Sequence, residues 1–266
     1  MSLNRSTAAV ASRLWNHEMM ATSRDFNERT EVKLRYAILS VPRSGSTLLS
    51  RALYETRMAG DPHEYLNPAA IAVHQEASGA ASMTVDAYLR EIEARRTSSN
   101  GYFGIKVHYF HLSRLCDTVE KKLRVATHFL RQQDRRVLIT RRDKIAQAIS
   151  YYIARQSGRW TSEHERHLQT DADANVSFDP VAIARCLQRI IEDEDGWRRA
   201  LSSAGLPYLE IFFEDFVTSY RVHMEKVFPY LGLDSILATS QPAMAPTTSI
   251  QAKKLGEQFR RYLALG

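Results

Sequence analysis

The chain has 266 residues, of which 44% are hydrophobic and 25% charged, values typical of a folded globular protein and not of a disordered one. The formal net charge of +6 favours an anionic partner, although charge alone does not choose among a nucleotide, a nucleic acid and a membrane surface. Two cysteines, Cys116 and Cys186, exclude a disulfide framework, and because no signal core or membrane-spanning stretch is evident we expect a cytoplasmic protein.

Apolar runs of strand length alternate with segments of helical periodicity along the chain. Strands are predicted at 35–41, 103–109, 136–140 and 207–213. Helices are predicted at 7–22, 48–54, 67–98, 112–132, 144–157, 180–204 and 217–232, with a polar loop at 158–178. This alternation is typical of an α/β fold in which a central, mostly parallel sheet carries helices on both faces. We expect a single domain over 1–266, with an N-terminal helical extension at 1–30 and a basic C-terminal tail at 238–266.

The segment VPRSGST at 41–47 lies between the first strand and the following helix. A helix N-terminus offers unpaired N–H groups, and small residues let the backbone wrap closely around a phosphate. Arg43 adds a cation, and Ser46 and Thr47 add hydroxyl donors. Since the spacing GxxxxGK[ST] is absent, the loop predicts a P-loop-like phosphate site without triphosphate hydrolysis.

A second segment, VLITRRDKIAQAISYY at 137–152, has the same strand-to-helix organisation. Arg141 and Arg142 stand at the end of the strand, and Ser150 follows within the helix. An arginine and a helix hydroxyl can together hold a phosphate. Two such loops, each after a parallel strand, predict a ligand with two separated anionic ends.

These two segments resemble the 5′-phosphosulfate loop and the 3′-phosphate motif of the PAPS-dependent sulfotransferases (PAPS is 3′-phosphoadenosine-5′-phosphosulfate). The bacterial carbohydrate group, with its trehalose and nodulation-factor sulfotransferases, is the most similar. AGDPHEYLNP at 59–68, FGIKV at 103–107, EDGW at 194–197 and EIFFEDFVTSY at 210–220 also fit that group. The resemblance runs from about residue 35 to the end of the chain.

The resemblance implies a sulfuryl transfer from PAPS to a hydroxyl of a carbohydrate or glycolipid, with PAP as the product and no metal. Residues of the first loop would hold the 5′-phosphosulfate: Arg43, Ser44, Gly45, Ser46 and Thr47. Ser150 would hold the 3′-phosphate together with Arg141 or Arg142, and the nine-residue spacing of the trehalose type favours Arg141. Lys253 and Lys254 would lie over the nucleotide. A homodimer is also implied.

Such a transfer needs a base, because a sugar hydroxyl is protonated at neutral pH. Glu64 matches the carboxylate that is the base of the trehalose enzymes, whereas His108 matches the histidine base of the Lys-x-His strand in cytosolic sulfotransferases. A strand would place Lys106 and His108 on one face, so both could enter a single cleft. We favour Glu64 and keep His108 as the alternative, with Arg43 stabilising charge on the leaving group.

Two other functions fit parts of the pattern. A nucleotide or sugar kinase would use a similar sheet, but the missing GK[ST] argues against it. A non-catalytic nucleotide- or RNA-binding module would need only the basic surface, with a steep salt dependence of RNA binding. We expect no nucleic-acid partner, since no run of like charges marks a nucleic-acid-binding tail.

Overall fold

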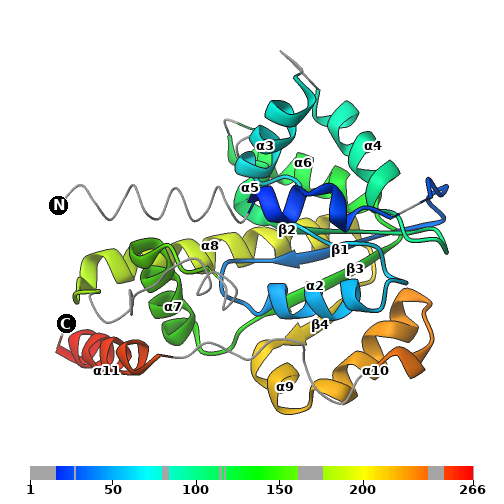
Figure 1. Ribbon diagram of the computed structural model, residues 1–266. Helices are drawn as coiled ribbons and strands as arrows, with labels where there is room; N and C mark the ends of the chain where they lie inside the picture. The colour runs from blue at the N-terminus through cyan, green and yellow to red at the C-terminus, as the bar shows by residue number, and fades with distance from the viewer. Residues whose placement is uncertain are drawn as a thin grey trace.

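The computed structural model describes residues 16–26, 28–79, 84–113, 116, 118–160, 176–238 and 249–265. Its sheet has the strand order β2-β1-β3-β4, and every pairing between these strands is parallel (Figure 1). The strands are β1 (Leu34–Ser40), β2 (Tyr102–His108), β3 (Arg135–Thr140) and β4 (Leu209–Phe212). Because parallel strands need crossover connections, their carboxyl ends meet at one edge of the sheet, where the two predicted phosphate loops begin.

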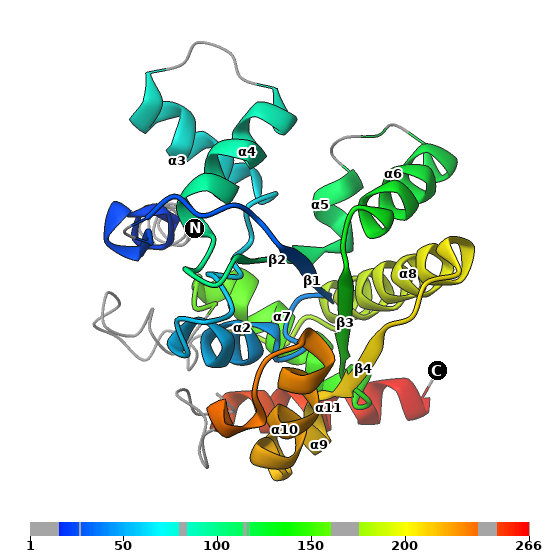
Figure 2. The same ribbon diagram turned by 90° about the vertical axis from the view of Figure 1, so that its right-hand side faces the viewer.

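Both faces of the sheet are covered by helices. Tyr36 and Ile38 of β1 pack on one face with α2 (Ser46–Glu55) and α10 (Tyr220–Leu231). Ala37 and Leu39 pack on the other face with α6 (Val119–Arg131) and α8 (Pro180–Ala204). Figure 2 shows the two helix layers on opposite sides of the strands. Burial on both faces explains why the strand is a continuous apolar run.

The other helices complete these layers and the edges of the sheet. They are α3 (Pro68–Ser78), α4 (Val85–Arg96), α5 (Tyr109–Ser113), α7 (Lys144–Ser157), α9 (Phe213–Thr218) and α11 (Ile250–Leu265), with 3-10 turns at Thr22–Arg24 and Ser235–Leu237. Asp143 and Asp179 begin α7 and α8, since each side chain accepts a hydrogen bond from the first turn of its helix. Of the helices within the described residues, none is long and apolar enough to cross a membrane.

The predicted α/β architecture, with a parallel sheet and helices on both faces, is confirmed. The helix predicted at 67–98 is wrong as one element, because Gly79 ends α3 in the left-handed conformation at φ 64° and α4 begins at Val85. The helices predicted at 112–132 and 217–232 are likewise each divided in two, and the second strand ends at His108. Of the helix predicted at 7–22, residues 16–20 are helical, while 7–15 and most of the loop at 158–178 lie outside the described residues.

Candidate functional site

The loop between β1 and α2 turns sharply over an aromatic ring. Gly45 has φ 88°, and a Cβ atom at this position would lie 2.4 Å from Cδ2 of Phe213. Only glycine therefore fits between the loop and the ring. Arg43 has φ 63°, a conformation that costs energy in a residue with a side chain and that often marks a functional position.

Helix α7 holds this loop through side-chain hydrogen bonds. Arg43 Nε donates to Ser150 Oγ at 2.8 Å, and Gln147 Nε2 donates to the Pro42 carbonyl at 2.8 Å. The Arg43 guanidinium also donates to the carbonyl of Trp160. The structure thus brings the first predicted loop against the second, although the two are about a hundred residues apart in sequence.

Some buried polar atoms in these two loops have no hydrogen-bond partner within the described residues. They are Ser44 Oγ at the first loop and Thr140 Oγ1 and Arg141 Nε at the second. An unpaired buried donor costs about 1–3 kcal/mol, and an oxyanion bound between the loops would remove that cost. Hydroxyl and guanidinium donors are the groups that an oxyanion such as a phosphate requires.

The adjacent arginines Arg141 and Arg142 have different surroundings. Arg142 makes a two-pronged ion pair with Asp215 at 2.5 and 2.6 Å, and its side chain is 52% exposed. The Arg141 side chain is 17% exposed, and its guanidinium carbon lies 4.8 Å from the centre of the Phe213 ring. Burial lowers the pKa of Arg141. Since Phe213 also contacts Gly45, Arg141 is the arginine beside the first loop.

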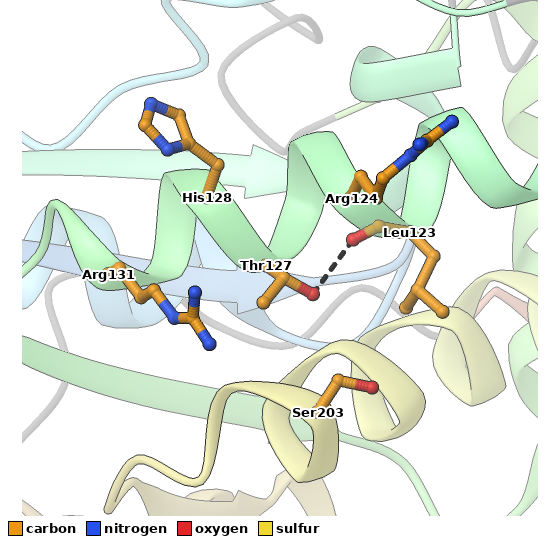
Figure 3. Close-up of a pocket in the computed structure, with 6 residues that line it drawn as sticks. All are labelled: Leu123, Arg124, Thr127, His128, Arg131 and Ser203. Atoms are coloured by element: carbon orange, nitrogen blue, oxygen red, sulfur yellow. Dashed lines mark hydrogen bonds between the residues drawn. The ribbon is translucent and has the colours of Figure 1, made fainter.

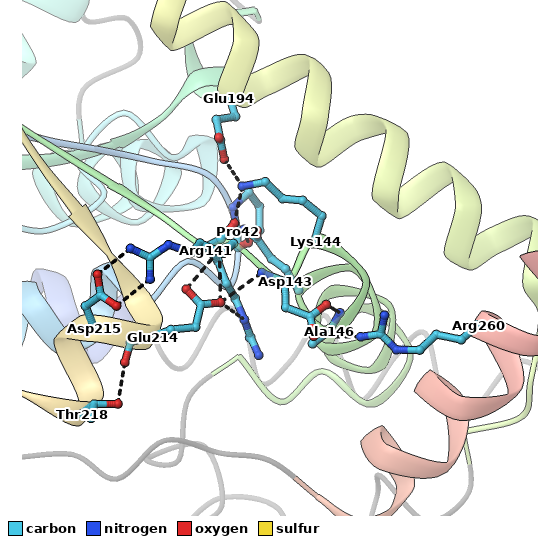
Figure 4. Close-up of polar contacts among 12 residues, drawn as sticks. Pro42, Arg141, Asp143, Lys144, Ala146, Glu194, Glu214, Asp215, Thr218 and Arg260 are labelled. Carbon is cyan, nitrogen blue, oxygen red and sulfur yellow. Dashed lines mark hydrogen bonds and ion pairs between the residues drawn. The ribbon is translucent and has the colours of Figure 1, made fainter.

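Glu214 caps the start of α7 from the neighbouring helix α9. Its carboxylate accepts hydrogen bonds from the N–H groups of Arg142 at 3.0 Å and Asp143 at 3.1 Å, and lies 3.7 Å from Arg141 Nε (Figure 4). Burial raises the pKa of Glu214, but these backbone donors outweigh it and the pKa is lowered. The N–H groups of Arg142 and Asp143 are therefore bound by a protein carboxylate, and the 3′-phosphate role of Arg141 and Ser150 stays a prediction.

The predicted base candidates lie together at the end of β2. Glu64 Oε1 is 2.9 Å from Lys106 Nζ and 3.2 Å from His108 Nε2. Lys106 Nζ also donates to Thr47 Oγ1 at 3.1 Å, which joins this cluster to the first loop. The residues come together because His63 forms a parallel β-bridge with Ile105, so the segment with Glu64 runs beside the edge of the sheet.

The charges in this cluster keep Glu64 ionised. Burial raises the pKa of Glu64, but Lys106, His108 and His111 together outweigh it and hold the pKa well below its usual range. Burial also lowers the pKa of the neighbouring His63 to about 3, so that imidazole is neutral near pH 7. The site therefore offers one carboxylate facing one ammonium and an imidazole, next to the loop between β1 and α2.

A buried ion cluster that the sequence did not predict fixes the segment before Glu64. Asp61 Oδ2 lies 2.7 Å from Arg96 Nη1, and Asp61 Oδ1 lies 2.6 Å from Arg24 Nη2. The side chains of Arg96 and Asp61 are almost wholly buried. Tyr65 also donates its hydroxyl to the Asp61 carbonyl at 2.5 Å. These contacts act on the backbone that carries Glu64 and hold it against β2.

Lys253 and Lys254 are exposed on α11, which packs against α7. Gln251 Nε2 donates to the Val176 carbonyl at 2.5 Å, and Arg260 pairs with Asp143 at 2.8 Å (Figure 4). Within the described residues these contacts place α11 beside the second loop without bringing the two lysines to it. Their role over a nucleotide stays a prediction.

A separate pocket of about 270 Å³ lies between α6 and the end of α8. Figure 3 shows Arg124 and His128 pointing away from α8, whereas Leu123, Thr127 and Arg131 face it. Because its cations do not converge, this pocket is a poor anion site. Among the described residues, no group of three or more His, Cys, Asp or Glu side chains is arranged to hold a metal ion.

Comparison with known proteins assigns the class of this site. The family model of the Stf0 sulphotransferases matches residues 35–262, a range that includes both loops, Glu64 and β2. The chain therefore belongs to the Stf0 sulphotransferase family, and it is an enzyme of the sulfotransferase class.

Individual relatives are more distant. The trehalose 2-sulfotransferase of Mycobacterium tuberculosis is 24% identical over 254 residues, which span 84% of this chain and 92% of the relative. A sulfotransferase structure from Alicyclobacillus acidocaldarius has a TM-score of 0.48 at 14% identity, covering 88% of this chain and 94% of its own. The structure of the sulfotransferase STF9 from Mycobacterium avium has a TM-score of 0.42 at 12% identity, covering 100% of this chain and 78% of its own.

Proposed function

We propose that this sulfotransferase moves a sulfuryl group from PAPS to a hydroxyl of a carbohydrate or glycolipid. The observation that carries the proposal is the hydrogen bond between Arg43 Nε and Ser150 Oγ at 2.8 Å. It makes the two anion-binding loops neighbours, which is the arrangement that one nucleotide with phosphates at both its 5′ and 3′ positions requires.

The nucleotide would be held at its two ends. Residues of the first loop, from Arg43 to Thr47, would bind the 5′-phosphosulfate, and the unpaired hydroxyl of Ser44 supports this role. Arg141 and Ser150 would bind the 3′-phosphate. Arg142 is bound to Asp215 and is not needed, which supports the choice of Arg141. Lys253 and Lys254 would reach the nucleotide only if α11 approached it more closely.

The transfer would proceed by in-line attack on sulfur. A new bond forms between the acceptor oxygen and sulfur, the bond from sulfur to the bridging oxygen breaks, and PAP leaves with the electron pair. The Glu64–His108 pair would receive the hydroxyl proton. Arg43 would stabilise the charge that develops on the leaving phosphate, and Lys106, between Thr47 and Glu64, would orient both reactants.

A carbohydrate acceptor is supported by the name of the Mycobacterium tuberculosis relative, which is a trehalose 2-sulfotransferase. The relative is distant, so a sugar or a glycolipid both fit the proposal. The homodimer and the cytoplasmic location also stay predictions.

The proposal is tested by incubating the protein with [35S]PAPS and a panel of free sugars and glycolipids. We expect label on at least one sugar, and loss of that label in Arg43→Ala. The matched control is Arg57→Ala, because Arg57 is the other arginine with a positive φ, at 57°, and lies outside the site. Transfer of label from [γ-32P]ATP, with none from PAPS, would instead establish the kinase alternative.

A further inference from the structure

Aromatic side chains from two elements lie beside the base candidates. Phe110 follows β2, and its ring stacks on that of His108, with 5.5 Å between the ring centroids and 16° between the planes. On α7, the ring centroid of Tyr151 lies 6.0 Å from that of Trp160. The proposed nucleotide loops follow β1 and β3, whereas Phe110 follows the edge strand β2 and belongs to neither loop. This aromatic surface is therefore available to the acceptor.

Two arginines from two helices lie against these rings. The guanidinium carbon of Arg189, on α8, lies 5.9 Å from the centre of the Phe110 ring, and that of Arg155, on α7, lies 5.8 Å from the centre of the Tyr151 ring. Burial raises the pKa of Tyr151, and the charges of Arg155 and Arg189 oppose that rise. Both guanidinium groups thus lie within electrostatic range of one phenol.

Asp193 holds Arg189 in place without using its terminal nitrogens. Arg189 Nε lies 3.0 Å from Asp193 Oδ2, and Lys122 Nζ lies 3.6 Å from Asp193 Oδ1. The side chain of Asp193 is 3% exposed, whereas that of Arg189 is 46% exposed. Within the described residues, the terminal nitrogens of Arg189 have no hydrogen-bond partner, and Arg155 contacts the Cys186 thiol but has no ion pair. Three cations therefore face one buried carboxylate.

An excess of positive charge beside a substrate site favours substrates that carry negative charge. We propose that the acceptor is a sugar with an anionic group, namely a carboxylate, a phosphate or a sulfate, which Arg189 and Arg155 bind while the sugar ring packs against Phe110 and Tyr151. This inference rests on the proposed sulfuryl transfer and narrows its acceptor class. A neutral sugar in the same position would cover the terminal nitrogens of Arg189 without supplying a charged partner, which makes it the weaker ligand.

Binding of small sugars to the full chain saturated with PAP tests the inference without turnover. The probes are methyl glucoside, methyl glucuronide, glucose 6-phosphate and glucose 6-sulfate, each followed by ligand-observed NMR titration. PAP fills the nucleotide site, so that the charged sugars do not bind there. We expect at least one charged sugar to bind about tenfold more tightly than methyl glucoside, the value of a charge-assisted hydrogen bond. Equal affinities, or no binding of any charged sugar, would overturn the inference.

Variants identify the residues that produce this preference. Arg189→Ala and Arg155→Ala should each bind the charged sugar about tenfold more weakly, while methyl glucoside and PAP bind as in the wild type. Arg199→Ala is the matched control, because Arg199 lies on the same helix and pairs with an aspartate four residues before it, whereas Arg189 pairs with one four residues after it. A preference that survived in both Arg189→Ala and Arg155→Ala would show the inference to be wrong. A loss of PAP affinity in Arg189→Ala would also overturn it, since this arginine would then bind the nucleotide.

The proposed function and this inference fail in different ways. If the wild type transferred no sulfuryl group to any acceptor, the proposed function would fail, while the sugar titration would still decide the inference. If transfer occurs, Arg189→Ala should raise KM for a charged acceptor about tenfold and leave kcat unchanged, because Arg189 binds the acceptor away from the reacting hydroxyl. A lower kcat with an unchanged KM would contradict this placement.

Discussion

The proposed phosphate loop (Arg43–Thr47) and the proposed base cluster (Glu64, Lys106 and His108) lie side by side, yet their polar groups are satisfied in opposite ways. In and beside the loop, Ser44 Oγ and Arg141 Nε are buried without a hydrogen-bond partner among the described residues. In the base cluster, Glu64 is already bound by Lys106 and by His108. In the proposed function the nucleotide would complete the first region, whereas the second is complete within the protein.

The difference follows from what each region must do. A site for a doubly charged ligand gains affinity when donors wait unpaired, even though each unpaired donor costs stability before the ligand binds. A buried carboxylate without a cation would be far more costly and would take up a proton. The proposed base therefore needs counter-charges at all times, and the lowered pKa of Glu64 results from them.

The largest expected effect is on activity, and it comes from removing the negative charge of Glu64. Glu64→Gln should lower kcat by about 10²–10⁴-fold, because the acceptor hydroxyl loses its base. PAP affinity, measured by calorimetry, should be unchanged, because the nucleotide is bound by the other region. Glu225→Gln, on the surface of α10, is the matched control. A loss of PAP affinity equal to the loss of activity would show that the two regions are not separate.

The next effect is on stability, through the ion cluster that holds the Glu64 segment. Asp61→Asn removes the buried carboxylate that Arg96 and Arg24 share, leaves Arg96 with Asp25 at 3.1 Å, and should lower the free energy of unfolding by about 3–5 kcal/mol. Asp195→Asn removes an exposed ion pair with Arg199 and should cost at most about 1 kcal/mol. Urea unfolding of both variants measures the two losses of stability. Equal losses would contradict the burial of the Asp61–Arg96 ion pair.

The pH dependence of stability tests the neighbour of Glu64. The pKa of His63 is about 3 in the folded protein, below that of an unfolded histidine, so between pH 6.5 and 3 the unfolded state binds more protons. Stability should therefore fall as the pH is lowered through this range. The contribution from His63 should reach about 3 kcal/mol by pH 4.

Two variants isolate this contribution. His63→Gln should flatten the fall in urea stability between pH 7 and pH 4, whereas His128→Gln, at an exposed position on α6, should not. If both variants followed the wild-type curve, His63 would not be buried in its neutral form.

The smallest effect has opposite signs on stability and on binding. Ser44→Ala removes a buried hydroxyl without a partner and should raise the free energy of unfolding without ligand by about 1 kcal/mol. The same change should weaken PAP binding about tenfold, because the ligand loses a donor. Ser235→Ala, at an exposed position, should alter neither value. A less stable Ser44→Ala protein would mean that this hydroxyl is already satisfied.

Much of this arrangement could be predicted from the sequence because its signals are local. The strand, the small-residue loop and the helix follow one another at 34–55, and the same order recurs at 135–157. Lys106 and His108 alternate along one strand, so their common face could be predicted. Gly79 carries the signal that divides α3 from α4, but the prediction of one helix at 67–98 did not use it.

Other features depend on contacts between distant segments and could not be predicted. The contact of Glu64 with His108 needs the β-bridge of His63 to Ile105. The spacing in the family resemblance favoured Arg141, but the different surroundings of Arg141 and Arg142 depend on Asp215 and Phe213 of α9, more than seventy residues away. Buried ion pairs such as Asp61 with Arg96 leave no periodic pattern, since charged residues are usually exposed.

The central claim is that the two loops hold opposite ends of one bisphosphorylated nucleotide, and calorimetry with PAP and AMP tests it most directly. The account predicts that the wild type and Arg142→Ala bind PAP about 10–100-fold more tightly than AMP, the value of charge-assisted hydrogen bonds to the 3′-phosphate. Arg141→Ala should lose this preference and bind AMP as before. Equal affinities for PAP and AMP in the wild type would contradict the account.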